Sequence, residues 1–245
     1  MSIRRIRIKG VSVIEPLFQV KVLCSNCEAE FKSSRVRPSF KKSSGSDTDF
    51  CLYYKEINPD YYVVRVCPFC GFASTESFSP NMNSAQKKLF QEKLGHNWSL
   101  RDYGGERSWD EALQVFKLAL LCAQIKNEKE RLIAGILHHI AWLYRHKNDG
   151  EQEKRFLQFA LESYTRFFET EGNEVNDARL MYLIGELNRR LGNYGPAVRW
   201  FSRVVNDRRI MDSGMIRACR EQWTQTREDM LAANMELPDD VKELK

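Results

Sequence analysis

Apolar and polar residues alternate along the first part of the chain and adopt a helical period further on. Phe18, Val20 and Val22 fall on one side of an extended chain, with polar residues opposite them. This period of two predicts a half-buried strand over residues 16–23. A β-branched and aromatic run predicts a second strand over residues 61–66. Each predicted strand leads directly into a cysteine.

After Pro80 the apolar residues recur at intervals of three and four, which is the pattern of amphipathic helices. Gly95 is expected to end the first helix, and residues 97–108 are expected to form an irregular connector. Polar turns are expected at 41–47 and 58–60. The pattern indicates an α+β fold that is mostly α. Helices are predicted over residues 84–94, 109–126, 129–146, 151–171, 175–191, 196–206 and 213–234.

The first nine residues alternate basic and apolar side chains, which suits an edge strand or a loose arm. They lack the apolar core of a signal peptide, and no apolar run long enough to span a membrane follows. We therefore expect a cytoplasmic protein without a membrane partner. The net charge of +5 and the pI of about 8.8 permit a nucleic-acid partner but do not demand one.

The clearest chemical signal is a pair of C-x-x-C knuckles. Cys24 and Cys27 form the first, Cys67 and Cys70 form the second, and 39 residues separate them. Two residues between cysteines let both thiolates of a tight turn face one ion, and two such turns complete a tetrahedral shell. The sequence therefore predicts one structural zinc ion in a zinc-ribbon-like domain, with no coordination position left for water.

The residue after each knuckle differs, since Gly71 follows the second and Glu28 follows the first. Glycine relaxes the turn and lets backbone amides approach sulfur, so the first knuckle is the less ideal half. Iron is the closest rival metal, because Cys-Pro-x-Cys-Gly also resembles a rubredoxin knuckle and four-sulfur sites accept either metal. A thioredoxin-type redox pair is disfavoured, because both pairs follow strands.

The three remaining cysteines have no partner at ligand spacing. Cys51 lies within the long spacer, and Cys122 and Cys219 lie in helical patterns. Each is interpreted as a small buried hydrophobe. Whether Cys51 approaches the metal stays open at this point.

Residues 184–204 read as a helix, a turn and a second helix, and they resemble a tetratricopeptide repeat. Gly185 and Ala197 would let paired helices approach, and Phe201 would fill the gap between them. A weaker copy has Glu153 where the small residue belongs. We expect an irregular tetratricopeptide-like array. The predicted organisation is a zinc-ribbon-like domain at 1–80, a helix and connector at 81–108, and the helical domain at 109–245.

The chain as a whole resembles a bacterial family of unknown function, in which a cysteine-knuckle domain precedes tetratricopeptide-like helices. The resemblance covers residues 17–227 and implies the architecture, a bacterial cytosolic origin and the same four ligands, but no reaction. It is carried by both knuckles with Phe31, Asp47-Thr48-Asp49-Phe50, Asn58-Pro59-x-Tyr61, Gly71-Phe72-Ala73, Ala141-Trp142-Leu143-Tyr144-Arg145 and residues 182–194.

The helical part carries an excess of arginine. Between residues 185 and 227 there are nine arginines, no lysine and four acidic residues. Arginine suits carboxylate or phosphate, so a protein partner of anionic character is expected on these helices. No catalytic constellation or phosphate loop is evident, so we expect a non-enzymatic interaction module.

The alternative is a nucleic-acid-binding zinc ribbon, and a rubredoxin-like iron electron carrier is less favoured. The nucleic-acid hypothesis rests on basic and aromatic residues of the ribbon. These are Arg4, Arg5, Arg7, Lys9, Lys32, Arg35 and Arg37, beside Tyr53, Tyr54, Tyr61 and Tyr62.

Overall fold

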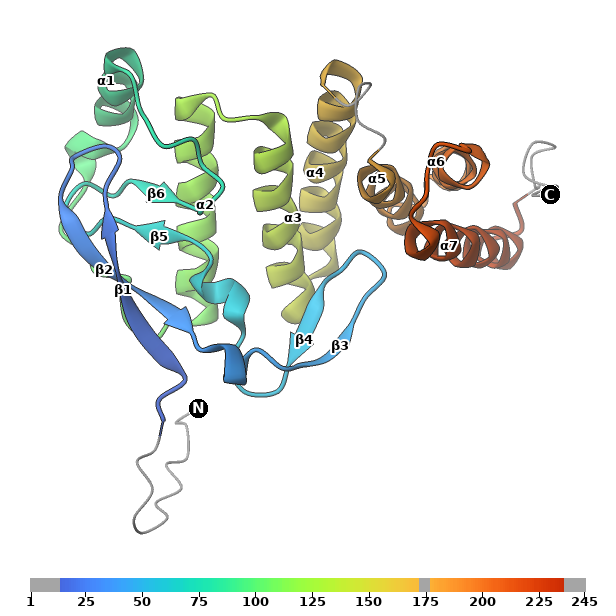
Figure 1. Ribbon diagram of the computed structural model, residues 1–245, viewed down its shortest axis with the longest axis horizontal. Coiled ribbons are helices and arrows are strands. Elements are labelled where there is room, and N and C mark those ends of the chain that lie inside the picture. Colours follow the sequence, from blue (N-terminus) through green and yellow to red (C-terminus); the bar gives the residue numbers. More distant parts are fainter. Residues whose placement is uncertain (1–13, 172–176, 236–245) are drawn as a thin grey trace, which may run out of the picture.

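The computed structural model describes residues 14–171 and 177–235. The predicted edge strand over residues 1–9 lies outside these ranges. Three small antiparallel sheets of two strands each come first, and helices follow (Figure 1). The fold is therefore mostly α with a small β part, as predicted. The sheets pair β1 (Leu17–Leu23) with β2 (Glu30–Val36), β3 (Ser43–Ser46) with β4 (Leu52–Tyr54), and β5 (Arg65–Val66) with β6 (Ala73–Ser74).

The helices follow the predicted periodicity closely. Side chains of Asn83 and Ser108 cap α1 and α2 by accepting backbone N–H groups, each in a capping box. From α2 onward each helix packs against its neighbour in sequence, so the chain builds an array of helices in chain order. The helices are α1 (Ser84–Lys93), α2 (Trp109–Lys126), α3 (Glu130–His146), α4 (Gly150–Thr170), α5 (Ala178–Arg190), α6 (Tyr194–Asn206) and α7 (Ser213–Ala232).

Two local predictions in the β part are wrong. Of the predicted strand 61–66, only Arg65–Val66 form a strand, β5, whereas Tyr61 and Tyr62 end a 3-10 helix at Pro59–Tyr62. Pro59 presets the helical φ, and the Asn58 side chain accepts the N–H of Asp60, which outweighs the strand propensity of the two tyrosines. The predicted turn 41–47 contains strand β3, whose four residues are all exposed, so no apolar alternation marks it.

Buried side chains form two clusters. The first joins the cysteine knuckles to α1, α2 and one side of α3. The second lies between the other side of α3 and the helices α4 to α7. Helix α3 therefore contributes to both, with Ile140 in the first cluster and Ala141 in the second.

The close approach of α5 and α6 depends on Gly185. A methyl group added there would lie 2.6 Å from the Phe201 ring, and both Phe201 and Ala197 are fully buried. This packing agrees with the small-residue and aromatic pattern read from the sequence. At the weaker copy, Glu153 does not pack as a small residue but accepts a charge-assisted hydrogen bond from Arg145 Nε at 2.7 Å.

Within the described ranges, none of the helices is both long and apolar enough to span a bilayer.

Candidate metal centre

The two knuckles have the same backbone geometry. In each, the N–H of the first cysteine donates to the carbonyl of the residue five positions later, at 3.0 Å for Cys24 and 2.9 Å for Cys67. The carbonyl of that cysteine accepts the N–H of the residue four positions later, at 2.9 Å in both knuckles. Each turn thus presents its two sulfurs on one side.

The residue that closes each turn adopts the left-handed conformation. Its φ is +61° at Glu28 and +77° at Gly71. Glycine adopts this conformation without a Cβ penalty, whereas glutamate does not. A second constraint acts on Gly71, because an added methyl group would lie 2.4 Å from the Trp98 ring. The sequence-based view of the first knuckle as the less ideal half agrees with this geometry.

The four sulfurs form a compact cluster. Cys24 and Cys70 are 3.6 Å apart at Sγ, as are Cys27 and Cys67, and all four Sγ atoms lie within 4.8 Å of one another. A tetrahedral ion with Zn–S bonds of 2.3 Å needs sulfurs about 3.8 Å apart. The donor set and its spacing therefore fit one tetrahedral metal ion. Among the described residues, no other group of three or more potential ligands converges in this way.

The electrostatics of the cluster favour metal binding. Hydrogen bonds from Cys24 and Cys70 lower the pKa of Cys67, which favours the thiolate form of this sulfur. The same contacts, with burial, raise the pKa of Cys24. A cation at the centre would release the remaining protons, because metals bind thiolates and not thiols. Only Cys27 is exposed, and the other three sulfurs lie inside the first core.

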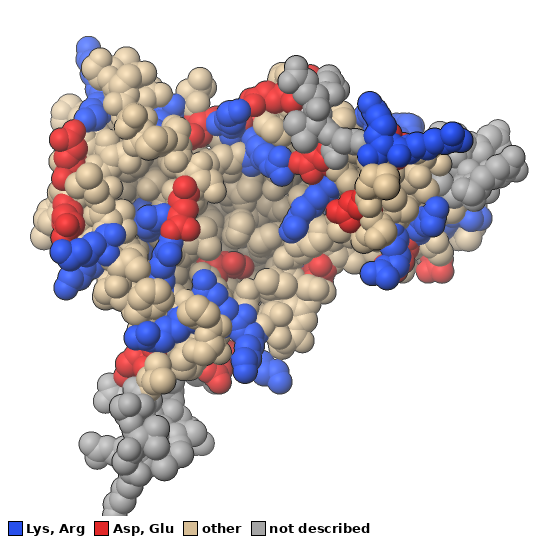
Figure 2. Space-filling view, in the orientation of Figure 1, with Lys and Arg blue, Asp and Glu red and all other residues tan. Residues whose placement is uncertain are grey.

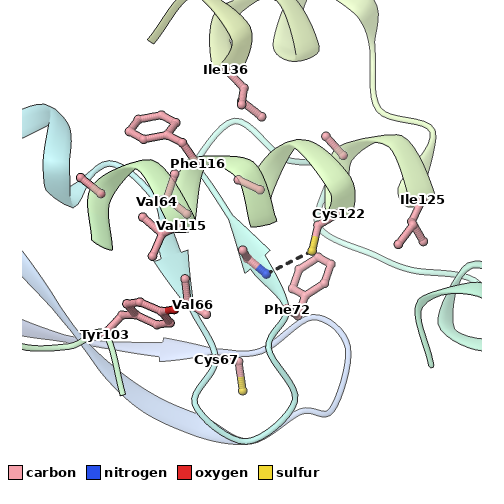
Figure 3. Close-up of a cluster of buried hydrophobic side chains, with 14 of the residues drawn as sticks. Val64, Val66, Cys67, Phe72, Tyr103, Val115, Phe116, Cys122, Ile125 and Ile136 are labelled. Carbon is pink, nitrogen blue, oxygen red and sulfur yellow. Dashed lines mark hydrogen bonds between the residues drawn. The ribbon is translucent and has the colours of Figure 1, made fainter. Parts of the chain in front are cut away.

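Helix α2 packs against the core side of the second knuckle. Figure 3 shows Cys67 and Phe72 below the helix, with Cys122 accepting the N–H of Ala73 at 3.3 Å. Burial raises the pKa of the Cys122 thiol to about 12, so it stays protonated and packs as an apolar group. The metal centre is thus continuous with the first core.

The connector 97–108 braces the ribbon, which the sequence did not predict. Trp98 Nε1 donates to the carbonyl of Pro68 within the second knuckle at 2.8 Å. Arg107 is 5% exposed and donates to the carbonyls of Val64 and Tyr103 at 2.7 and 2.8 Å. Burial lowers its pKa to about 10. Trp98 and Arg107 in a glycine-containing loop were the only available signal for this role.

The remaining cysteines lie away from the cluster. Cys51 contacts His146, with 3.5 Å between Sγ and Nε2, and is not among the clustered sulfurs. Cys219 is buried in α7 within the second core. Burial raises the pKa of each of these thiols to about 12.

The residues of the nucleic-acid hypothesis are partly engaged within the protein. Arg35 pairs with Glu76, and Arg37 donates to the carbonyl of Glu15 and lies over Phe18. Those before residue 14 lie outside the described ranges. On the face shown in Figure 2, positive side chains form separate groups with negative and uncharged side chains between them. That face has no continuous basic stripe of the kind that tracks a phosphate backbone.

The fold and the cluster define a class: a mostly helical protein with a small β part, in which four cysteines could hold a metal ion. The chain belongs to the bacterial family described as "Uncharacterized protein conserved in bacteria (DUF2225)", whose model matches residues 17–226. The resemblance found in the sequence is thereby confirmed. Neither a curated protein nor a solved structure matches the chain.

Proposed function

We propose that this protein is a zinc-binding, non-enzymatic protein–protein interaction module, in which one structural zinc ion staples the ribbon and the helical array docks a protein partner. The observation that carries the proposal is the convergence of the four sulfurs at tetrahedral spacing. Four thiolates complete the shell of the ion, so its contribution is to folding and not to a reaction.

The other thiols support a non-enzymatic role. A nucleophilic cysteine needs a lowered pKa, yet burial raises the pKa of Cys51 to about 12. Its neighbour His146 has the wrong tautomer for a general base. The Asn58 carbonyl oxygen accepts the N–H of Asp60 at 2.9 Å, so the Asn58 amide nitrogen faces His146 Nδ1 and donates to it. The proton of neutral His146 then lies on Nε2, pointing to the sulfur.

A partner on the helices is supported by their charge. The region 185–227 holds nine arginines against four acidic residues. Guanidinium groups bind carboxylates bidentately, so an anionic protein surface is the partner chemistry that they suit.

The double substitution Cys67→Ser and Cys70→Ser tests the metal part of the proposal. The purified variant should contain no stoichiometric zinc and should unfold at a much lower temperature than the wild type. The matched control is Cys219→Ser, a buried cysteine in the second core, which should keep one zinc per chain. If the double variant kept both its metal and its melting temperature, the proposed staple would be wrong.

A further inference from the structure

The hairpin β3–β4 reaches out of the β part and places its turn, residues 47–51, against the helices (Figure 1). We call the surface that receives this turn the α3–α5 groove. It is lined by residues of two helix faces, namely His138, Trp142 and Arg145 of α3 and Arg179, Tyr182, Glu186 and Arg190 of α5.

Helix α3 forms a pocket for one carboxylate. Arg145 donates to both oxygens of Asp49, at 2.9 and 2.7 Å, in the bidentate geometry that favours carboxylates. Trp142 Nε1 donates to the same side chain at 3.0 Å, and His138 Nε2 lies 3.1 Å from it. Asp49 is fully buried, and these three donor side chains all come from one face of helix α3.

Helix α5 contacts the two residues that flank this carboxylate. The Tyr182 hydroxyl donates to the carbonyl of Thr48 at 2.7 Å, and Arg190 donates to the Thr48 hydroxyl at 3.0 Å. The Arg179 guanidinium lies over the Phe50 ring, 4.2 Å from the ring centroid. The centroids of the Phe50 and Tyr182 rings are 5.5 Å apart. The two helices thus recognise a short sequence of acidic, polar and aromatic residues.

The helical part orients the cations of the groove by itself. Arg145 Nε donates to Glu153 of α4 at 2.7 Å, and Arg190 Nε donates to Glu186 at 2.7 Å. Because each guanidinium keeps an acidic partner outside the hairpin, the groove is preorganised for an incoming carboxylate. These acidic partners also compensate the arginines when the hairpin is absent.

The hairpin contacts the helices mainly through its turn, and Tyr53 of β4 adds a ring contact with His146, with 5.3 Å between the ring centroids. Its strands pair only with each other, and β3 is exposed along its whole length. Phe50 has a φ of +69°, which is unfavourable for an aromatic residue. It is held both by the turn, where the Phe50 N–H donates to the carbonyl of Asp47 at 3.0 Å, and by the contacts of its ring with Arg179 and Tyr182. The turn therefore occupies the groove in the way that a bound peptide would.

We propose that the α3–α5 groove is a binding site for acidic peptide segments of the pattern Asp-x-Asp-aromatic, and that the hairpin turn occupies it in cis until a partner segment displaces it. This inference rests on the proposed interaction-module function and names the class of its partner. The occupant is a segment of another protein that presents a carboxylate to Arg145 and an aromatic ring to Arg179.

The test begins with a full-length variant whose groove is emptied by Asp47→Ser, Thr48→Gly, Asp49→Ser and Phe50→Gly. The probe is a fluorescein-labelled peptide with the sequence of residues 44–53, carrying serine in place of Cys51. Fluorescence anisotropy should show that the variant binds this peptide at least tenfold more tightly than the wild type does. A peptide with asparagine in place of Asp49 should bind at least tenfold more weakly. A folded, zinc-containing variant that binds no better than the wild type would overturn the proposal.

A measurement on the wild type covers the case in which the variant does not fold. Hydrogen exchange of residues 44–53 is followed with excess unlabelled peptide, and the asparagine peptide serves as the control. Displacement predicts at least tenfold faster exchange with the acidic peptide only. If neither peptide changes the exchange, the turn is a permanent structural clasp and the proposal fails. Zinc content is measured on the same samples, so failure of the groove and failure of the metal staple are distinguishable.

Discussion

The four-cysteine cluster, which is the candidate metal centre, and the α3–α5 groove are two sites of polar contact that join separate parts of the chain in different ways. The metal centre takes all four sulfurs from two short turns of the same kind, and it lies in the first core. The groove binds a turn to helices 89 or more residues away, and it holds that turn by ion pairs and hydrogen bonds. We therefore expect loss of a bound metal to act first on the ribbon, and loss of the groove contacts to loosen the joint between ribbon and helices.

Removal of the metal should have the largest effect. Structural zinc contributes on the order of 10 kcal/mol of apparent folding free energy, because the site is not preformed in the unfolded chain. A strong chelator should therefore remove the hydrogen-exchange protection of β1, β2 and α2. The helices α6 and α7 lie in the second core and should keep more of theirs. Equal loss of protection throughout would contradict the separation of the two sites.

The next largest effect is expected for Arg145→Met. This guanidinium donates to Asp47, Asp49 and Glu153, and its loss leaves a fully buried Asp49 without its main counter-charge. Breaking one side of a buried ion pair costs about 3–5 kcal/mol, and denaturant unfolding would measure it. Burial alone would raise the pKa of Asp49, but Arg145 and His138 hold it well below the usual range.

The matched control is Arg166→Met, which breaks an ion pair of the same length with Glu130. Its charged atoms are also 2.7 Å apart, but the side chains of Arg166 and Glu130 are 59% and 28% exposed. Exposed pairs contribute about 0–1 kcal/mol, so this variant should remain close to the wild type. A similar loss of unfolding free energy in both variants would show that burial in the groove does not determine the cost of breaking an ion pair.

The two sites also differ in how far they could be predicted from sequence. The C-x-x-C spacing encodes the candidate metal centre locally, and the apolar period set helix boundaries such as those of α2, predicted and found at residues 109–126. Strand β3 escaped prediction because an exposed serine and glycine segment carries no apolar pattern. The role of the turn 47–51 escaped because Asp49 meets Arg145 only through the tertiary fold, 96 residues away.

The smallest effect is expected within the knuckles, from Gly71→Ala. The left-handed φ disfavours any Cβ, and the added methyl group meets the Trp98 ring, which a hydrogen bond to Pro68 holds in place. Strain and overpacking of this kind cost about 1–3 kcal/mol. Thermal unfolding of the zinc-loaded protein measures the loss. Glu28→Ala is the control, since that position already carries a Cβ at a left-handed φ, and its stability should change by less than about 1 kcal/mol.

The central claim is that the four cysteines form a closed shell around one zinc ion. X-ray absorption at the zinc edge of the purified full chain tests it directly. We expect one zinc per chain and a first shell of four sulfurs at about 2.3 Å, without nitrogen or oxygen. A shell containing nitrogen or oxygen ligands, or a protein loaded with iron in place of zinc, would contradict it.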